Sequence, residues 1–199
     1  MPDHNQTAPG ELEVVRRFIN TWSIPNDTRE ETDALPELAR TPEVWRKAFP
    51  HQSRSRADAL VRLQRLRADL RSACQGESSS DEALNEWFNS AALRVKTRRK
   101  DGATKLIVES SEASFAGYIV AVVANAIASG EWARLKTCPD CQWAFYDHTR
   151  NGSKRWCGMT KGGPNGRACG TIAKVAAYRA REAMEGGCCL KSCFPGDEC

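Results

Sequence analysis

The sequence predicts a mainly α-helical N-terminal domain with one β-hairpin, followed by a small module that is held together by cysteines. Two observations carry this prediction. Apolar residues recur at helical spacing through most of the first 133 residues, and four of the nine cysteines lie within residues 137–170. A chain of 199 residues can form one core and a small satellite, so we expect domains at residues 1–133 and 134–185 and a cysteine-rich tail at residues 186–199.

The N-terminal part begins with two helical segments. Residues 1–10 are polar and are expected to form a frayed terminus. Residues 11–22 are amphipathic and should form the first helix, and the polar residues 24–36 should form a loop. Thr41 starts a second helix, because its hydroxyl can accept a free backbone N–H and Pro42 at the first helical position loses no hydrogen bond.

The third helix is marked by leucines that recur at helical spacing in residues 60–70. We expect its outer face to hold Arg62, Arg65 and Arg67. A short fourth helix should begin at Ser80, which is followed by two acidic residues that suit the first turn.

The pattern then changes to alternation, which is typical of strands. Residues 93–108 alternate apolar and polar side chains around Asp101 and Gly102, a pair that suits a tight turn. We therefore expect a hairpin near residues 92–109, the only one of the first domain. Residues 111–130 are apolar on most faces and should form the central core helix.

The net charge of +4 is unevenly distributed along the chain. Residues 134–185 hold ten Lys or Arg against four Asp or Glu, whereas the residues before Arg134 sum to −1. A basic module beside a near-neutral domain predicts a polyanion partner, duplex DNA first. We expect a basic helix after Cys169, on which Lys174 and Arg179 are the first candidates for base contacts; a solvated surface role is an equal alternative for any single cation. The DNA-binding candidates are Arg150, Lys154, Arg155, Arg167, Lys174, Arg179 and Arg181.

The cysteines predict one structural zinc ion. Their odd number and uneven placement argue against a disulfide framework. Cys138 and Cys141 form a CxxC turn, and Cys157 and Cys169 complete a set of four soft ligands, which Zn²⁺ binds tetrahedrally with no open position for catalysis. Two alternatives are four reduced thiols without metal, and His148 as a ligand, which we leave outside the set.

The order of motifs in this module resembles the CGNR zinc-finger family. The resemblance covers residues 134–182 and rests on the CxxC pair, FYDHTRN, RWCGM and a final Cys-Gly. It implies a treble-clef or ribbon-like zinc finger in a DNA-binding transcriptional regulator. The chain departs from the family at Thr171 and Ile172, where relatives carry Asn-Arg, and this departure bears on DNA affinity more than on zinc.

The N-terminal part resembles the ABATE domain that accompanies this finger, through its arrangement of elements and the motif Phe18-Ile19-Asn20-Thr21. That resemblance implies a response to stress or to a small ligand or protein bound by this domain.

Other classes of function remain open at this point. The finger could bind protein, and Cys188, Cys189 and Cys193 of the tail could sense thiol oxidation or a soft metal, although incidental thiols in a disordered tail are the simpler interpretation. The sequence carries no HExxH, GxSxG or phosphate-loop motif, so we expect no enzyme. It also lacks a signal peptide and an apolar membrane-spanning run, so we expect a cytoplasmic protein without membrane contact.

Overall fold

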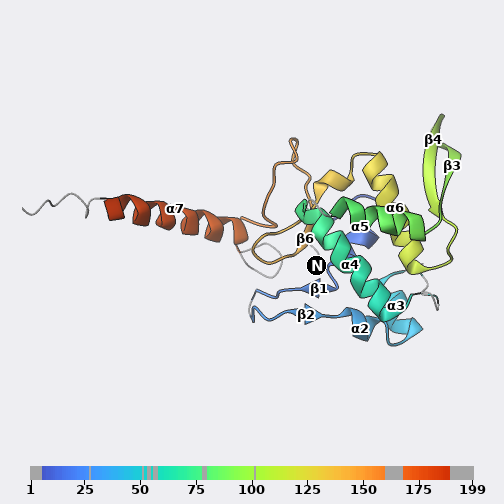
Figure 1. The fold of residues 1–199 in the computed structure, drawn as a ribbon, viewed down its shortest axis with the longest axis horizontal. Coiled ribbons are helices and arrows are strands. Elements are labelled where there is room, and N and C mark those ends of the chain that lie inside the picture. The colour runs from blue at the N-terminus through green and yellow to red at the C-terminus, as the bar shows by residue number, and fades with distance from the viewer. Residues whose placement is uncertain are drawn as a thin grey trace, which may run out of the picture.

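The computed structural model describes residues 6–26, 28–50, 52, 55, 58–77, 80–100, 102–159 and 168–188, except for the side chains of residues 100 and 185–188. The described elements, in chain order, are α1 (Leu12–Ile19), β1 (Trp22–Ser23), β2 (Thr32–Asp33), α2 (Leu35–Leu38), α3 (Pro42–Ala48), α4 (Leu60–Gln75), α5 (Ser80–Ser90), β3 (Leu93–Lys100), β4 (Ala103–Ser110), α6 (Phe115–Ala128), the 3-10 turn η1 (Trp132–Arg134), β5 (Leu135–Thr137), β6 (Ala144–Tyr146) and α7 (Cys169–Cys188). The β3–β4 hairpin and α7 project from opposite ends of a helical body (Figure 1).

The helices expected from the sequence are present, and polar side chains fix where they begin. The hydroxyl of Thr41 accepts the Val44 N–H at the start of α3, as the sequence predicts. The start of α6 uses a residue far away in the chain, since the buried carboxylate of Asp58 accepts the N–H groups of Phe115 and Ala116 at 2.9 Å each. Asp58 therefore joins the α3–α4 connection to the central helix.

The prediction of a single hairpin in the first domain was wrong. In the described chain, β1 and β2 also pair, Trp22 with Asp33 and Ser23 with Thr32, so the first helix ends at Ile19, before the expected residue 22, and β2 lies in the segment expected to be a loop. The physical reason is Arg67, which is buried instead of lying on the outer face of α4. Its guanidinium donates to Asp33 at 2.6 and 2.7 Å and to the Thr21 hydroxyl at 2.9 Å, and the hydrogen bonds to Asp33 lower the pKa of that carboxyl.

The main core surrounds α6 and the first helix. Phe115 stacks edge-on against Trp45 and Phe18, with ring centroids 4.7 and 5.4 Å apart, and Phe49 closes the cluster. Edge-to-face aromatic pairs add to the free energy gained from burial, so these rings fix how α1, α3 and α6 pack. None of the helices in the described ranges is long and apolar enough to cross a membrane.

The β5–β6 hairpin belongs to two cores at once. Leu135, Ala144 and Tyr146 are buried in the helical core, whereas Phe145 is buried among the cysteines. Successive side chains of a strand point to opposite faces, so one face of the hairpin packs on the helices and the other supports the cysteines. The boundary at residue 134 stays a prediction, but the two parts share this hairpin.

Two helices of the N-terminal part hold that hairpin by its backbone. The Asn20 side chain, at the end of α1, accepts the Ala144 N–H at 2.7 Å and donates to the Ala144 carbonyl at 2.9 Å. Arg71 of α4 donates to the Gln142 carbonyl at 3.1 Å and stacks on Trp22, with its guanidinium 4.0 Å from the ring centroid. Burial lowers the pKa of Arg71 to about 10.

We expect Asn20→Ala to lower the free energy of unfolding by about 1 to 3 kcal/mol, because it leaves the Ala144 N–H and carbonyl without their amide partner. Urea unfolding measured by circular dichroism tests this. Asn85→Ala on the exposed face of α5 is the matched control and should change stability by less than about 0.5 kcal/mol. Equal stability of the two variants would contradict the proposed clamp.

Candidate metal centre

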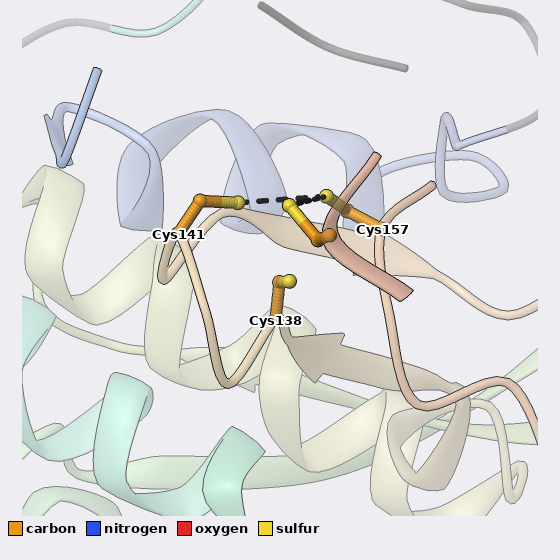
Figure 2. A group of neighbouring side chains, drawn as sticks. Cys138, Cys141 and Cys157 are labelled. Carbon is orange, nitrogen blue, oxygen red and sulfur yellow. Dashed lines mark hydrogen bonds between the residues drawn. The ribbon is translucent and has the colours of Figure 1, made fainter. Parts of the chain in front are cut away.

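Four cysteine sulfurs meet at one buried point of the C-terminal part. The ligand atoms of Cys138, Cys141, Cys157 and Cys169 all lie within 4.8 Å of one another. The Cys141 and Cys157 sulfurs are 3.5 Å apart, and the Cys157 and Cys169 sulfurs are 3.7 Å apart. Figure 2 shows the labelled side chains Cys138, Cys141 and Cys157 directed toward one another. A tetrahedral zinc site with Zn–S bonds of about 2.3 Å requires sulfurs about 3.8 Å apart, so the cluster has the dimensions of such a site.

The first two cysteines come from the turn that joins β5 to β6. The Cys138 N–H donates to the Trp143 carbonyl at 2.9 Å, and the Gln142 N–H donates to the Cys138 carbonyl at 2.8 Å. Gln142 closes the turn in the left-handed region, with φ of 59°. This geometry presents Cys138 and Cys141 to the same side of the hairpin, as the CxxC spacing predicts.

The other two cysteines come from a loop and from the start of α7. Cys169 is the first residue of α7, and the Gly170 N–H donates to the Gly158 carbonyl at 2.9 Å. A Cβ atom at position 170 would lie 2.1 Å from the Met159 sulfur and 3.1 Å from a Trp156 ring carbon, so a larger residue here would displace the Met159 side chain. The Thr171 hydroxyl donates to the Met159 carbonyl at 2.6 Å, which secures the same contact.

The four thiols need a cation to ionise together. Hydrogen bonds from Cys141 and Cys157 lower the pKa of Cys138, whereas hydrogen bonds to Cys138 and Cys141, together with burial, raise the pKa of Cys157. Burial also raises the pKa of Cys169. Within this cluster, the ionisation of one thiol therefore opposes the ionisation of its neighbours. A divalent cation that prefers sulfur offsets this cost and binds all four as thiolates, which is the chemistry of a zinc site with four cysteine ligands.

A buried carboxylate organises the loop that leads to Cys157. Asp147 is fully buried and accepts hydrogen bonds from the Lys136 ammonium, the backbone and hydroxyl of Thr149, and the Lys154 N–H, at 2.6 to 2.9 Å. Burial alone would raise its pKa, but these donors hold the pKa of Asp147 well below its usual range. The loop from residue 147 to residue 154 is thus built around one charge.

Two basic residues of this part of the chain serve the same loop. Arg134 donates to the carbonyls of Asp147, Thr149 and Arg150 at 3.0, 2.7 and 3.3 Å. Lys136 donates to the Asp147 carboxylate and to the carbonyls of Gly152 and Lys154. Arg134 and Lys136 therefore hold the backbone in place, although both count toward the basic surplus of residues 134–185.

The loop candidates for DNA contact lie together on the surface. Arg150 and Arg155 are exposed, and Lys154 is half-buried, with its ammonium 5.4 Å from the Phe145 ring centroid. Lys154 and Arg155 line two neighbouring hollows of about 540 and 630 Å³. They form the ridge between these hollows, directly beside the metal centre.

The helix candidates do not share one face. Lys174, Arg179 and Arg181 are all exposed on α7. At about 100° per residue, Lys174 and Arg181 lie on one face, whereas Arg179 lies about 140° from Lys174 and beside the apolar residues Ile172 and Val175. Lys174 and Arg179 therefore cannot read neighbouring bases from one side of the helix, and Arg181 is the partner of Lys174 on its face.

Several residues singled out by the sequence lie elsewhere or outside the described ranges. His148 is outside the cluster, with its Nε2 atom 2.8 Å from the Thr7 carbonyl. Arg167, Cys189, Cys193 and the side chain of Cys188 lie outside the described part of the structure.

The expectation that residues 1–10 fray was wrong for the described part of this segment. Gln6 and Ala8 are 3% and 4% exposed, and the Gln6 amide donates to the Cys157 carbonyl at 2.7 Å. Alternation or helical spacing gives no signal for such a contact, because it joins residues far apart in the chain.

Comparison with known proteins agrees with this geometry. Residues 134–182 match the family model described as CGNR zinc finger, and this range contains all four clustered cysteines. A search of curated proteins finds no match. The predicted resemblance is confirmed for the finger and stays a prediction for the ABATE-like domain. The matching family and the geometry of the four cysteines together support a zinc-binding finger with one structural ion.

We expect protein purified under reducing conditions to contain one zinc ion per chain, and Cys157→Ser to lose it because three thiolates no longer enclose the ion. Elemental analysis by mass spectrometry measures the ratio. Cys74→Ser, at a free cysteine outside the cluster, should keep the ion. A Cys157→Ser protein with a full zinc content would contradict the assignment.

Asp147→Asn should lower the free energy of unfolding by about 2 to 4 kcal/mol, because it leaves Lys136 without its charged partner in a partly buried site. The folded-state pKa lies below the ordinary value of 3.8, so this contribution is fully present above that pH and is lost as the pH falls further. The stability difference from the native protein should thus stay constant between about pH 8 and 5 and shrink below about pH 4.

Asp81→Asn, which removes an exposed acid from the first turn of α5, is the control for this substitution and should cost less than about 0.5 kcal/mol. A stability difference for Asp147→Asn that grows as the pH falls below about 4 would contradict the assigned role of the carboxylate.

Proposed function

We propose that the protein is a zinc-dependent DNA-binding transcriptional regulator whose finger contacts duplex DNA and whose N-terminal part responds to stress or to a ligand. The observation that carries this proposal is the surface ridge of Lys154 and Arg155. Its backbone is fixed by the Asp147 network beside the metal centre. A rigid backbone with cations at the surface can bind phosphates without a large loss of conformational entropy.

The charge of the finger supports a polyanion as the partner. Residues 134–185 carry +6, and four thiolates around one Zn²⁺ reduce this to +4. Arg134 and Lys136 are used within the finger, so the attraction comes from the other basic side chains. The described exposed or half-buried candidates are Arg150, Lys154, Arg155, Lys174, Arg179 and Arg181.

Helix α7 is the element best suited to a groove. It runs for 20 residues from the metal centre, and residues 171–184 are exposed apart from the half-buried Ala173. It projects away from the body in Figure 1. The major groove of B-DNA admits one α-helix, so we assign the Lys174 and Arg181 face to the DNA.

A hollow of the N-terminal part supports the proposed response to a ligand. It has a volume of about 920 Å³ and lies between α6, the β3–β4 hairpin and the start of α1, with Tyr118, Val122, Arg98 and Lys105 among its lining residues. This volume suits a small organic ligand. The Tyr118 hydroxyl donates to the Glu11 carboxylate at 3.4 Å, and burial, followed by the negative charge of Glu11, raises the pKa of Tyr118 to about 12.

We propose binding as the activity, without catalysis, and a reducing cytoplasmic environment. Free thiols at the metal centre suit such an environment.

Duplex DNA binding as a function of salt is the decisive experiment. About three to five phosphate contacts would give a slope of log affinity against log salt of about −3 to −4.5. Replacing Lys154 and Arg155 together by alanine should make the slope shallower by about 1.8 and weaken binding across sequences, because each lost contact removes about 0.9 from the slope. Fluorescence anisotropy of the full zinc-loaded chain with a labelled duplex measures both quantities.

Arg46 and Lys47 provide the matched control, since they are an adjacent exposed basic pair on α3. Replacing both by alanine removes the same charge and should leave the slope within about 0.3 of the native value, an allowance for long-range electrostatics. Absence of duplex binding at low salt would contradict the regulator proposal and favour a zinc-stabilised protein-interaction module.

A further inference from the structure

The β3–β4 hairpin is the most unevenly charged element outside the finger. Residues 93–110 hold six Lys or Arg against two Asp or Glu, a net charge of +4 that equals the net charge of the whole chain. A count over the whole N-terminal part hides this surplus, because the remaining residues before Arg134 are acidic overall.

The strand register places Arg94, Lys96, Arg98 and Lys105 on one face of the ribbon and Arg99 on the other. Residues that pair directly share a face, so Arg94 with Glu109, Lys96 with Ile107 and Arg98 with Lys105 lie on the same side.

Arg98 and Lys105 are like charges placed directly opposite each other, which destabilises the free hairpin. Glu109 pairs with Lys96 at 2.6 Å and with Arg98 at 3.1 Å, but no acidic partner of Lys105 is found among the described residues. Lys96 and Arg98 are 57% and 65% exposed, so their ion pairs are weak and can be exchanged for another anion.

The root of the hairpin is fixed, and its outer half is exposed to solvent, with Arg98 and Lys105 also lining the open hollow beside α6. The Asn125 amide of α6 accepts the Val108 N–H and donates to the Val108 carbonyl, both at 2.8 Å, and the Ser110 hydroxyl donates to the Ala91 carbonyl at 2.7 Å. Beyond this anchor the described side chains of residues 94–99 and 102–106 are exposed, and the hairpin extends away from the body in Figure 1. The ribbon thus presents its basic face from a rigid base.

We propose that the outer half of this hairpin is a second DNA-binding element that enters the major groove of duplex DNA. Two strands about 4.8 Å apart form a ribbon that fits a groove about 12 Å wide. Lys96, Arg98 and Lys105 then meet phosphates and base edges, and phosphate binding relieves the repulsion between Arg98 and Lys105.

The inference rests on the proposed function for its partner, duplex DNA, but it uses a surface separate from the finger. The hairpin and α7 lie at opposite ends of the molecule (Figure 1), so they contact different stretches of DNA or different duplexes. A-form RNA offers a narrow major groove that side chains do not reach, so the ribbon favours B-form DNA over duplex RNA.

The test replaces Arg98 and Lys105 together by threonine in the full zinc-loaded chain, since threonine suits an exposed strand. We expect duplex affinity at about 0.1 M salt to fall roughly tenfold or more and the salt slope to become shallower by about 1.8, the value for two lost contacts. The charge-retaining variant Arg98→Lys with Lys105→Arg should keep the native slope. Val95→Thr with Leu106→Thr, on the opposite face of the same strands, is the matched control and should also keep it.

Each outcome separates the hairpin from the finger. If Arg98→Thr with Lys105→Thr leaves affinity and slope unchanged while the Lys154 and Arg155 change weakens binding, the hairpin inference is overturned and the proposed function stands. If the hairpin change weakens binding and the Lys154 and Arg155 change does not, the inference stands and the surface formed by Lys154 and Arg155 is excluded as the contact. If the native protein binds duplex RNA as tightly as duplex DNA, and the Arg98→Thr with Lys105→Thr change makes the salt slope shallower by the same amount for both, the assignment to the major groove is overturned. The circular dichroism spectrum of each variant is measured first. If the double threonine variant has a changed spectrum, the single variants Arg98→Thr and Lys105→Thr are compared with Arg98→Lys and Lys105→Arg instead.

Discussion

The structure depends on the β5–β6 hairpin, because one face of it packs in the helical core and the other face packs against the cysteines. Its strands are three residues long, yet their alternation places Leu135 and Tyr146 in the helical core and Phe145 among the cysteines. Asn20 completes the arrangement by binding the Ala144 backbone from α1. A module with four cysteines and few apolar residues cannot bury enough surface alone, so the metal and this shared hairpin together stabilise it. The orientation of the metal centre is therefore fixed relative to the helices.

The described basic residues divide into buried or half-buried ones that hold the fold and exposed ones whose side chains lie at the surface. Arg67 and Arg71 tie α4 to β2 and to the CxxC turn, and Arg134 and Lys136 hold the loop before Cys157. These side chains have carbonyl or carboxylate partners within the chain, because a buried charge without such partners would be costly. A count of charges along the sequence treats both kinds alike, so the surplus in the finger overstates the positive surface that a polyanion would meet.

Local patterns predicted the longer helices, the turn at Gly102 and the four metal ligands, because helical spacing, turn chemistry and the CxxC motif each act over a few residues. The short helix α2 was missed, and the larger errors involve partners far apart in the chain. The β1–β2 pair needs Arg67 from α4, and the N-terminal segment is buried because Gln6 reaches the carbonyl of Cys157, 151 residues away. A sequence read in windows cannot show such contacts. Asn20 belongs to a motif that the sequence did single out, but its role became clear only with Ala144 beside it.

The hairpin and the Asp147 loop show how the same chemistry can indicate stability in one place and recognition in another. At Asp147 the Lys136 ammonium, the Thr149 hydroxyl and the Lys154 N–H all donate to one carboxylate, so the charges stabilise the loop conformation. At the outer half of β3 and β4, Arg98 faces Lys105, so the arrangement opposes folding and is tolerated because the root is anchored to Asn125. Natural sequences are locally consistent except where function requires otherwise. The exposed repulsion on an anchored ribbon is therefore a stronger sign of an external anion than the larger basic surplus of the finger, much of which the finger uses for itself.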